Sequence, residues 1–159
     1  MKKALRGKQA YIDTNIFIYV ALKHPDFHRE CYSILEALVK GEYIGFGSHL
    51  ILFELFGSLS KLSYEAAYEA ASEYLNLPIT LLTPNRETLA YAREIAKLSN
   101  TTYDSMHAAL VAQNKLDIVI TEDLSDWRRI LRAWPKLREK LEAKPIAILS
   151  PTRGLVTSP

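Results

Sequence analysis

Four carboxylates occupy positions where an acid is costly to bury, and they come from well-separated parts of the chain. They are Asp13, Glu54, Asp104 and Asp123. The first three each stand in a long stretch that carries few or no other charges. A buried carboxylate without compensation either takes up a proton or finds a partner. Convergence on one hard cation would compensate several acids at once, and oxygen ligands suit Mg²⁺ or Mn²⁺. The pattern therefore predicts a divalent metal site.

Each acid also has an ordinary structural interpretation. Asp13 can cap the helix that follows it, Asp104 can be a first-turn acid favoured by the helix dipole, and Asp123 can form a turn. Glu54 fits none of these, because it lies in the middle of an apolar helix. No lysine or arginine lies between residues 41 and 60 to pair with it. Glu54 is therefore the most informative of the four.

Such a metal site indicates phosphodiester hydrolysis. Mg²⁺ keeps several waters, which leaves coordination positions for phosphate oxygens and for an attacking water whose pKa the ion lowers. The segment from Arg128 to Lys144 holds seven lysines and arginines against two glutamates, a net charge of 7 − 2 = +5. A basic segment beside an acidic site suits a nucleic-acid substrate, although a solvated helix face is the commoner meaning of such a run.

Short apolar segments alternate with amphipathic ones, which predicts parallel strands joined by crossover helices. We expect an α/β fold, a three-layer α/β/α sandwich with a central, mainly parallel sheet of about five strands. The strands are expected at 11–12, 43–46, 78–82, 118–121 and 146–149, and a basic helical region at 127–144 is expected to break at Pro135. In such sheets functional groups gather beyond the carboxyl ends of the strands, near the point where strand order reverses. Asp13 and Asp123 both follow predicted strands.

The chain of 159 residues is predicted to be a single domain over residues 1–150 with a loose tail at 151–159. Cys31 is the only cysteine, which excludes an intrachain disulfide and a zinc cage of cysteines. Its longest apolar stretches, 16–22 and 50–56, are far shorter than the roughly 20 residues that cross a bilayer. We expect a cytoplasmic protein that does not span a membrane.

At these residues the sequence resembles the PIN-domain nucleases, and among them the VapC type of toxin–antitoxin ribonuclease. The resemblance spans most of the chain and depends on the order and spacing of several short motifs. They are Tyr11-Ile12-Asp13-Thr14-Asn15, Glu54-Leu55 followed by Leu59, Tyr103-Asp104 followed by Ala108-Ala109-Leu110, and Thr121-Glu122-Asp123 with Asp126-Trp127.

This resemblance implies a metal-dependent endoribonuclease that acts on RNA, forms a homodimer and is paired with an antitoxin protein. The four acids would be the metal-binding residues, and Asn15 and Thr121 would orient them through hydrogen bonds. The last motif departs from the commoner pattern of two aspartates one residue apart. Asp123 and Asp126 are separated by two residues, which leaves the role of Asp126 open and makes Glu122 a minor competitor.

Other interpretations stay open at this point. The chain could be a PIN-domain nuclease of RNA processing without an antitoxin, or an RNA- or protein-binding module that has lost catalysis. A phosphatase or phosphate-accepting receiver ranks last, because Asp13-Thr14-Asn15 lacks the second aspartate of the usual phosphatase pair. Gly45 to Leu50 is only a partial dinucleotide-binding fingerprint and is expected to make a turn. His107 follows Asp104 by one helical step and is taken as structural.

Overall fold

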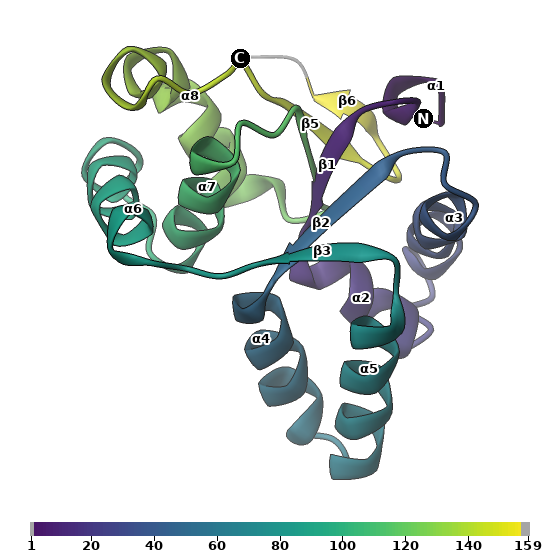
Figure 1. Cartoon of the computed structure of the whole chain (residues 1–159). Helices are drawn as coiled ribbons and strands as arrows, with labels where there is room; N and C mark the ends of the chain where they lie inside the picture. Colours follow the sequence, from purple (N-terminus) through teal and green to yellow (C-terminus); the bar gives the residue numbers. More distant parts are fainter. Residues whose placement is uncertain (1, 157–159) are drawn as a thin grey trace.

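A computed structural model describes residues 2–156 and contains one six-stranded sheet with the strand order β3-β2-β1-β4-β5-β6 (Figure 1). Neighbouring strands are parallel except for the pair β5–β6, which is antiparallel. The α/β prediction with a mainly parallel sheet is confirmed, with one strand more than expected. The strands are β1 (Gln9–Ile12), β2 (Ile44–Ser48), β3 (Ile79–Leu82), β4 (Ile118–Ile120), β5 (Ala147–Ser150) and β6 (Gly154–Val156).

Seven of the eight helices of residues 2–156 form two groups around this sheet, and the short α1 belongs to neither. Helices α6, α7 and α8 contact one another, whereas α2, α3, α4 and α5 form the other group. Figure 1 shows the first group to the left of the sheet, α3 to its right, and α4 with α5 extending below it. The helices are α1 (Lys2–Leu5), α2 (Thr14–Ala21), α3 (His28–Val39), α4 (His49–Ser60), α5 (Tyr64–Asn76), α6 (Arg86–Ser99), α7 (Tyr103–Gln113) and α8 (Leu124–Leu141). No helix of residues 2–156 is long and apolar enough to cross a membrane.

Several helix starts follow directly from capping residues in the sequence. The side chains of Ser48 and Ser63 accept hydrogen bonds from backbone N–H groups of the first turns of α4 and α5. Asn85 and Thr88 form a reciprocal capping box at the start of α6. These caps fix where the chain leaves β2 and β3, and so they set how α4 and α6 approach the sheet.

The strand order reverses at β1, which lies between β2 and β4. From β1 the chain proceeds outward through β2 and β3, then returns across the sheet to β4 and β5 on the other side. The loops after β1 and β4 therefore diverge and leave room for a cleft between them. The backbone N–H of Asp13 donates to the carbonyl of Ile120 over 2.9 Å, which holds the ends of these two strands together.

Two predictions about the C-terminal third of the chain were wrong. The basic region is one uninterrupted helix, α8, with Pro135 inside it. Trp134 and Leu137 on either side of the proline are buried, and the Trp134 indole donates to the carbonyl of Lys144 over 2.8 Å. This packing offsets the backbone hydrogen bond that proline cannot donate, a cost of about 3 kcal/mol in an unsupported helix.

The second difference concerns the chain from Pro151 onward, which was expected to be a loose tail. Residues 154–156 instead form β6, which pairs with β5, with Leu149 opposite Leu155. Residues 157–159 lie outside the described part of the chain. A turn of three residues, 151–153, joins the two strands.

Gly45 and Gly47 lie within strand β2, so the expectation that this segment makes a turn was also wrong. A Cβ atom at Gly45 would meet the side chain of Leu38, and one at Gly47 would meet the Tyr74 hydroxyl. The Tyr74 hydroxyl donates to the carbonyl of Ser48 over 2.9 Å and accepts from its N–H over 2.9 Å. The glycines thus leave space for α3 and α5 to pack against the strand.

Candidate active site

All four predicted acids line one cleft of about 490 Å³ beyond the carboxyl ends of β1 and β4. They reach it from four separate elements: the start of α2, the middle of α4, the first turn of α7 and the start of α8. The strand reversal at β1 is therefore what brings them together. The cleft is lined by Asp13, Thr14, Asn15, Ile18, Glu54, Gly57, Ser58, Lys61, Tyr103, Asp104 and Asp123.

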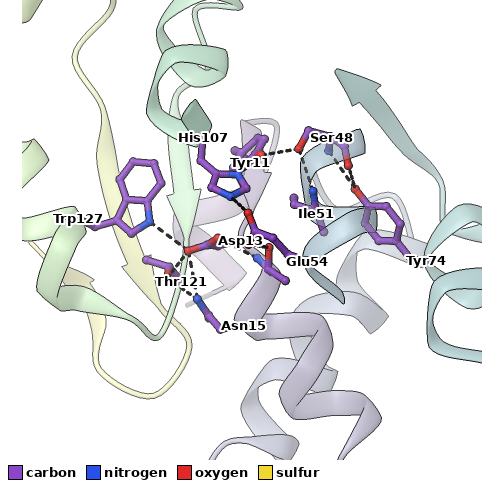
Figure 2. A network of polar contacts seen from close by, with 11 residues as sticks. Tyr11, Asp13, Asn15, Ser48, Ile51, Glu54, Tyr74, His107, Thr121 and Trp127 are labelled. Atoms are coloured by element: carbon purple, nitrogen blue, oxygen red, sulfur yellow. Dashed lines mark hydrogen bonds and ion pairs between the residues drawn. The ribbon is translucent and has the colours of Figure 1, made fainter. Parts of the chain in front are cut away.

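Asp13 is the most firmly held of these acids, with only 4% of its surface exposed. Its Oδ1 accepts a hydrogen bond from the Thr14 backbone N–H over 2.8 Å, as a helix cap does. Its Oδ2 accepts from the Asn15 amide at 3.1 Å, the Thr121 hydroxyl at 2.9 Å and the Trp127 indole at 3.1 Å. Figure 2 shows Asn15 of α2, Thr121 directly after β4 and Trp127 of α8 converging on the carboxylate. The capping interpretation is correct but accounts for only one of the four donors.

Glu54 is held at both of its carboxylate oxygens. The Thr14 hydroxyl donates to Oε2 over 2.9 Å, and Nε2 of His107 lies 2.6 Å from Oε1. Burial alone would raise the pKa of Glu54, but the hydrogen bond and positive charge of His107, together with the hydrogen bond from Thr14, lower it below its ordinary value. Glu54 therefore stays ionised, and its orientation is fixed from two sides.

The histidine that holds Glu54 is itself part of a buried chain of hydrogen bonds. His107 is 1% exposed, and its Nδ1 lies 2.7 Å from the Tyr11 hydroxyl. That hydroxyl lies 2.9 Å from the Ser48 hydroxyl, and the backbone of Ser48 is in turn bound by Tyr74 (Figure 2). Burial lowers the pKa of His107, but the hydrogen bond to Glu54 and the surrounding carboxylate charges outweigh it and raise the pKa. The structural interpretation of His107 missed this contact with the site.

Asp104 has the most unfavourable electrostatic environment in the cleft. Burial, the charge of Asp13 and a hydrogen bond with Asp126 raise the pKa of Asp104 to about 7. Asp126 forms an ion pair with Arg129, and the hydrogen bond from Arg129 lowers the pKa of Asp126. Arg129 therefore compensates Asp126, whereas the cleft carries more negative charge around Asp104 than its protein neighbours neutralise.

The remaining predicted residues differ in whether their side chains face the cleft. Asn15 and Thr121 contact each other over 2.9 Å as well as contacting Asp13, so both lie where a supporting role requires them. Asp123 caps α8 through the N–H of Ser125 and is exposed at the rim of the cleft. Glu122 instead binds the turn after β5, where it accepts from the hydroxyls of Ser150 and Thr152 and from the Thr152 N–H. Glu122 is therefore directed away from the other acids.

The donor set fits a hard divalent cation. One carboxylate oxygen each of Asp13 and Asp104 and one ring nitrogen of His107 lie within 4.8 Å of one another. Both nitrogens of His107 are already engaged, by Tyr11 and by Glu54. The carboxylates of Asp13 and Asp104 are therefore better placed than His107 to bind a cation, since a carboxylate oxygen can accept more than one contact, and His107 instead orients Glu54 in the same cleft. A cation here would also relieve the excess negative charge around Asp104.

Two contacts of the site were not found by sequence reasoning, those of His107 and Trp127. His107 follows Asp104 by three residues, a spacing that places both side chains on one face of a helix, and this was the available signal. Trp127 follows Asp123 by four residues on α8, so its indole is directed back toward the strand ends in the same way. Neither spacing specifies a partner, because the partners lie on other elements.

Comparison with known proteins places this geometry in a family. The model of the PIN domain family matches residues 10–131. A search of curated protein sequences gives no significant match. Similar solved structures include VapBC2 from Rickettsia felis bound to a DNA fragment from its promoter (22% identity, 76% of this chain and 92% of that chain, TM-score 0.61). DNA-bound VapBC from Salmonella typhimurium is also similar (19% identity, 92% and 98%, TM-score 0.63).

A third similar structure is VapC20 from Mycobacterium tuberculosis, described as a toxin that cleaves the Sarcin-Ricin loop (14% identity, 74% and 92%, TM-score 0.61). At such low identities these structures establish the fold that they share with this chain. The family match covers most of the sequence, including Asp13, Glu54, Asp104 and Asp123. From this match and the common fold, we conclude that the chain belongs to the PIN domain family.

Proposed function

We propose that this protein is a metal-dependent endoribonuclease of the VapC type, the toxin of a toxin–antitoxin pair. The observation that carries the proposal is the convergence of Asp13, Glu54, Asp104 and Asp123 from four elements on one cleft. PIN-domain nucleases are hydrolases, and one structure similar to this chain is that of a toxin described as cleaving the Sarcin-Ricin loop. We further propose that the chain acts as one domain, which includes β6 as well as the expected residues 1–150, in the cytoplasm.

Under this proposal Asp13, Glu54 and Asp104 hold Mg²⁺ or Mn²⁺, with Asp123 at the rim. When bound, the ion supplies charge stabilisation at the phosphate and makes a water more acidic. The four donors on Asp13 keep its carboxylate in one orientation, and His107 with Thr14 does the same for Glu54. The pKa of Asp104 is about 7 without the ion, and a bound cation would lower it and favour the ionised carboxylate as a ligand.

The direct test measures cleavage of a labelled RNA by purified protein, with and without Mg²⁺ or Mn²⁺. We expect cleavage that requires the ion and that is lost in Asp13→Asn and Asp104→Asn, with the fold retained by circular dichroism. The control is Asp26→Asn, which makes the same substitution at an exposed loop position outside the cleft. Cleavage at the wild-type rate by the two site variants would refute the catalytic role.

The same experiment separates this proposal from a binding module. An inactive module would bind RNA without cleaving it under any metal condition. Genomic context separates a toxin from a nuclease of RNA processing, because a small DNA-binding protein encoded directly upstream would identify the antitoxin. Its co-expression should suppress both cleavage and growth arrest.

We propose the apolar groove between α2, α3 and α5 as the place where such an antitoxin binds. The groove has a volume of about 260 Å³, and Phe17, Leu35 and Val39 are among its lining side chains. An amphipathic helix that places its apolar face in a groove is a common mode of peptide recognition. Val39 is 63% exposed, so Val39→Glu should keep the fold and RNA cleavage but lose inhibition by the antitoxin. Unchanged inhibition would place the antitoxin elsewhere.

We also propose that the protein is a homodimer. Large apolar side chains are unusually exposed along α4 and α5, with Phe53 74%, Tyr64 73% and Tyr68 70% exposed. An apolar surface of this kind in a soluble chain commonly marks a protein interface. Light scattering should give the mass of a dimer for the wild type and that of a monomer for Phe53→Ser. A monomeric wild type at micromolar concentration would contradict the proposal.

A further inference from the structure

Helix α8 carries cations that its own protein does not neutralise. Two of its basic side chains are paired, Arg129 with Asp126 and Lys140 with Glu94, and just beyond its end Lys144 is paired with Asp117. Others are exposed and form no ion pair with any residue from 2 to 156. These unpaired cations are Arg128, Arg132, Lys136 and Arg138.

Two of the unpaired cations share a pocket with Arg129. The pocket lies between α8 and the end of α6, has a volume of about 330 Å³, and contains no carboxylate in its lining. Arg129, Arg132 and Lys136 form its basic side, and Leu98 and Ala133 contribute apolar surface. A solvated helix face would carry its charges on an open surface. Here three cations surround one hollow beside exposed apolar carbon, which suits an anionic ligand that also has an apolar part.

Arg129 connects this pocket with the acid cleft. Its guanidinium pairs with Asp126, which contacts Asp104 in the cleft, and its Nη1 also donates to the carbonyl of Asn100 over 2.8 Å. These contacts fix the guanidinium at the boundary between the two sites. A guanidinium has five N–H donors, so Arg129 keeps donors for a further ligand.

The spacing of the cations fits a chain of negative charges better than a single small anion. Arg132 and Lys136 are one i,i+4 step apart, which is roughly 6 Å along the helix, and Lys136 lies roughly 15 Å along α8 from Asp126. A nucleic-acid strand carries one charge per roughly 3.4 Å even when fully stacked. The basic side of the pocket is therefore long enough to run beside several phosphates.

We propose that Arg129, Arg132 and Lys136 form a phosphate-binding subsite for the RNA strand, beside the cleft in which the proposed cleavage takes place. The subsite rests on the proposed function, since it requires RNA to enter the acid cleft. Phosphate contacts of this kind position a strand without reading its bases. The subsite therefore supplies affinity and register, and sequence preference must come from other parts of the surface.

The test uses full-length protein and a fluorescent 12-nucleotide RNA, with binding measured by anisotropy at several salt concentrations. Cleavage is prevented in all samples by EDTA. The variant Arg132→Ala/Lys136→Ala removes two exposed side chains and should keep the fold. For single strands the slope of log K against log salt is about 0.7 per phosphate contact, so the slope should fall by about 1.4. Affinity should then fall by roughly 25-fold at 0.1 M salt, and the two curves should converge near 1 M.

The control is Arg29→Ala/Lys40→Ala, which removes the same formal charge from the first turn of α3 and from its C-cap, in the other helix group; Lys40 is paired with Glu36. The control should change affinity and slope much less than the α8 variant. Equal effects from both double variants, or an unchanged slope for the α8 variant, would overturn the subsite. Equal competition by polyglutamate and by unlabelled RNA would also overturn it, because it would show unspecific attraction of any polyanion.

Kinetics keep this inference distinct from the proposed function. With active protein and metal, the α8 variant should raise KM for the 12-nucleotide RNA about as much as it weakens binding, with kcat unchanged. KM for a dinucleotide, which is too short to reach the pocket, should not change. Cleavage by the wild type with an unchanged KM in the α8 variant refutes only the subsite, whereas absence of cleavage by the wild type refutes the proposed function.

Discussion

Replacing Asp104 by Asn should stabilise the metal-free protein, and the gain should grow with pH. The pKa of Asp104 is about 7 in the folded chain, against an ordinary value of 3.8. Between these two values the folded state holds the proton and the unfolded state does not, so the stability of the wild type falls as pH rises from 3.8 through 7. Asparagine cannot ionise and does not suffer this loss.

The size of the effect follows from the two pKa values. Proton binding is linked to folding, so the free energy of unfolding of Asp104→Asn relative to that of the wild type should increase by about 2.5 kcal/mol between pH 5 and pH 8. Part of Asp104 remains in contact with water, which screens its charge, so we expect about 1 to 2 kcal/mol. Above pH 8 the advantage should level off, because Asp104 is then ionised in both states.

The assay is urea unfolding in EDTA at pH 5, 6, 7 and 8, followed by the fluorescence of the two buried tryptophans, Trp127 and Trp134. Asp26→Asn is the control and should follow the wild type at every pH. If the free energies of unfolding of Asp104→Asn and the wild type change in parallel with pH, the cleft does not carry the excess negative charge that we assign to it.

A second experiment measures how Mg²⁺ or Mn²⁺ changes the Tm of the same two proteins. An ion at ten times its Kd stabilises a folded protein by about 1.4 kcal/mol. Mg²⁺ or Mn²⁺ should therefore raise the Tm of the wild type, and it should raise the Tm of Asp104→Asn much less because a ligand is missing. Equal stabilisation of the two proteins would show that the ion binds elsewhere.

Three further predictions concern neighbouring residues. Glu54→Gln removes a charge without changing shape and should lower kcat by roughly 100-fold or more, beyond the 10- to 100-fold typical of supporting residues, as measured by steady-state RNA cleavage. His107→Gln should lower kcat about 10- to 100-fold with KM for RNA unchanged, because it loosens Glu54; an equal rise in KM would contradict this positioning role. Glu122→Gln should leave kcat unchanged and cost about 1 kcal/mol in urea unfolding, since the Glu122 side chain binds the Ser150–Thr152 turn and its contact with Asn15 is made by the backbone, which the substitution keeps.

The sequence was sufficient to predict the sheet and the acid cluster because both depend on local patterns. Alternation of apolar strands and amphipathic helices specifies a parallel sheet, and the order of the motifs places Asp13 and Asp123 after strands. The one uncapped, unpaired acid in an apolar helix, Glu54, pointed to a shared site. The four acids converge because the strand order reverses at β1. The α/β pattern predicts such a reversal but does not predict which strands are neighbours.

The missed features depend on contacts between distant elements. His107 binds Glu54 and Tyr11, which are 53 and 96 residues away, so its local sequence resembles that of any alanine-rich helix. The continuation of α8 through Pro135 depends on burial of its flanking side chains, because helix propensity alone favours a break. The pairing of residues 154–156 with β5 likewise depends on the free edge of that strand, and the local sequence of these residues does not indicate this pairing.

Helix α8 connects the acid cleft with the unpaired cations. Because these two groups of charges occupy different parts of the helix, substitutions in them should have different kinetic effects. The N-cap of α8, Asp123, lines the acid cleft, and near the start of the helix Asp126 contacts Asp104 and the Trp127 indole donates to Asp13. The following turns carry the unpaired cations. A cleft of carboxylates alone would repel a polyanion. Under the proposed function, affinity for RNA would therefore come from outside the cleft, and a cation bound inside it would serve the chemical step. Changes to the acids should therefore lower kcat, and changes to Arg132 or Lys136 should raise KM. Arg129 contacts both systems, so Arg129→Ala should change both constants at once.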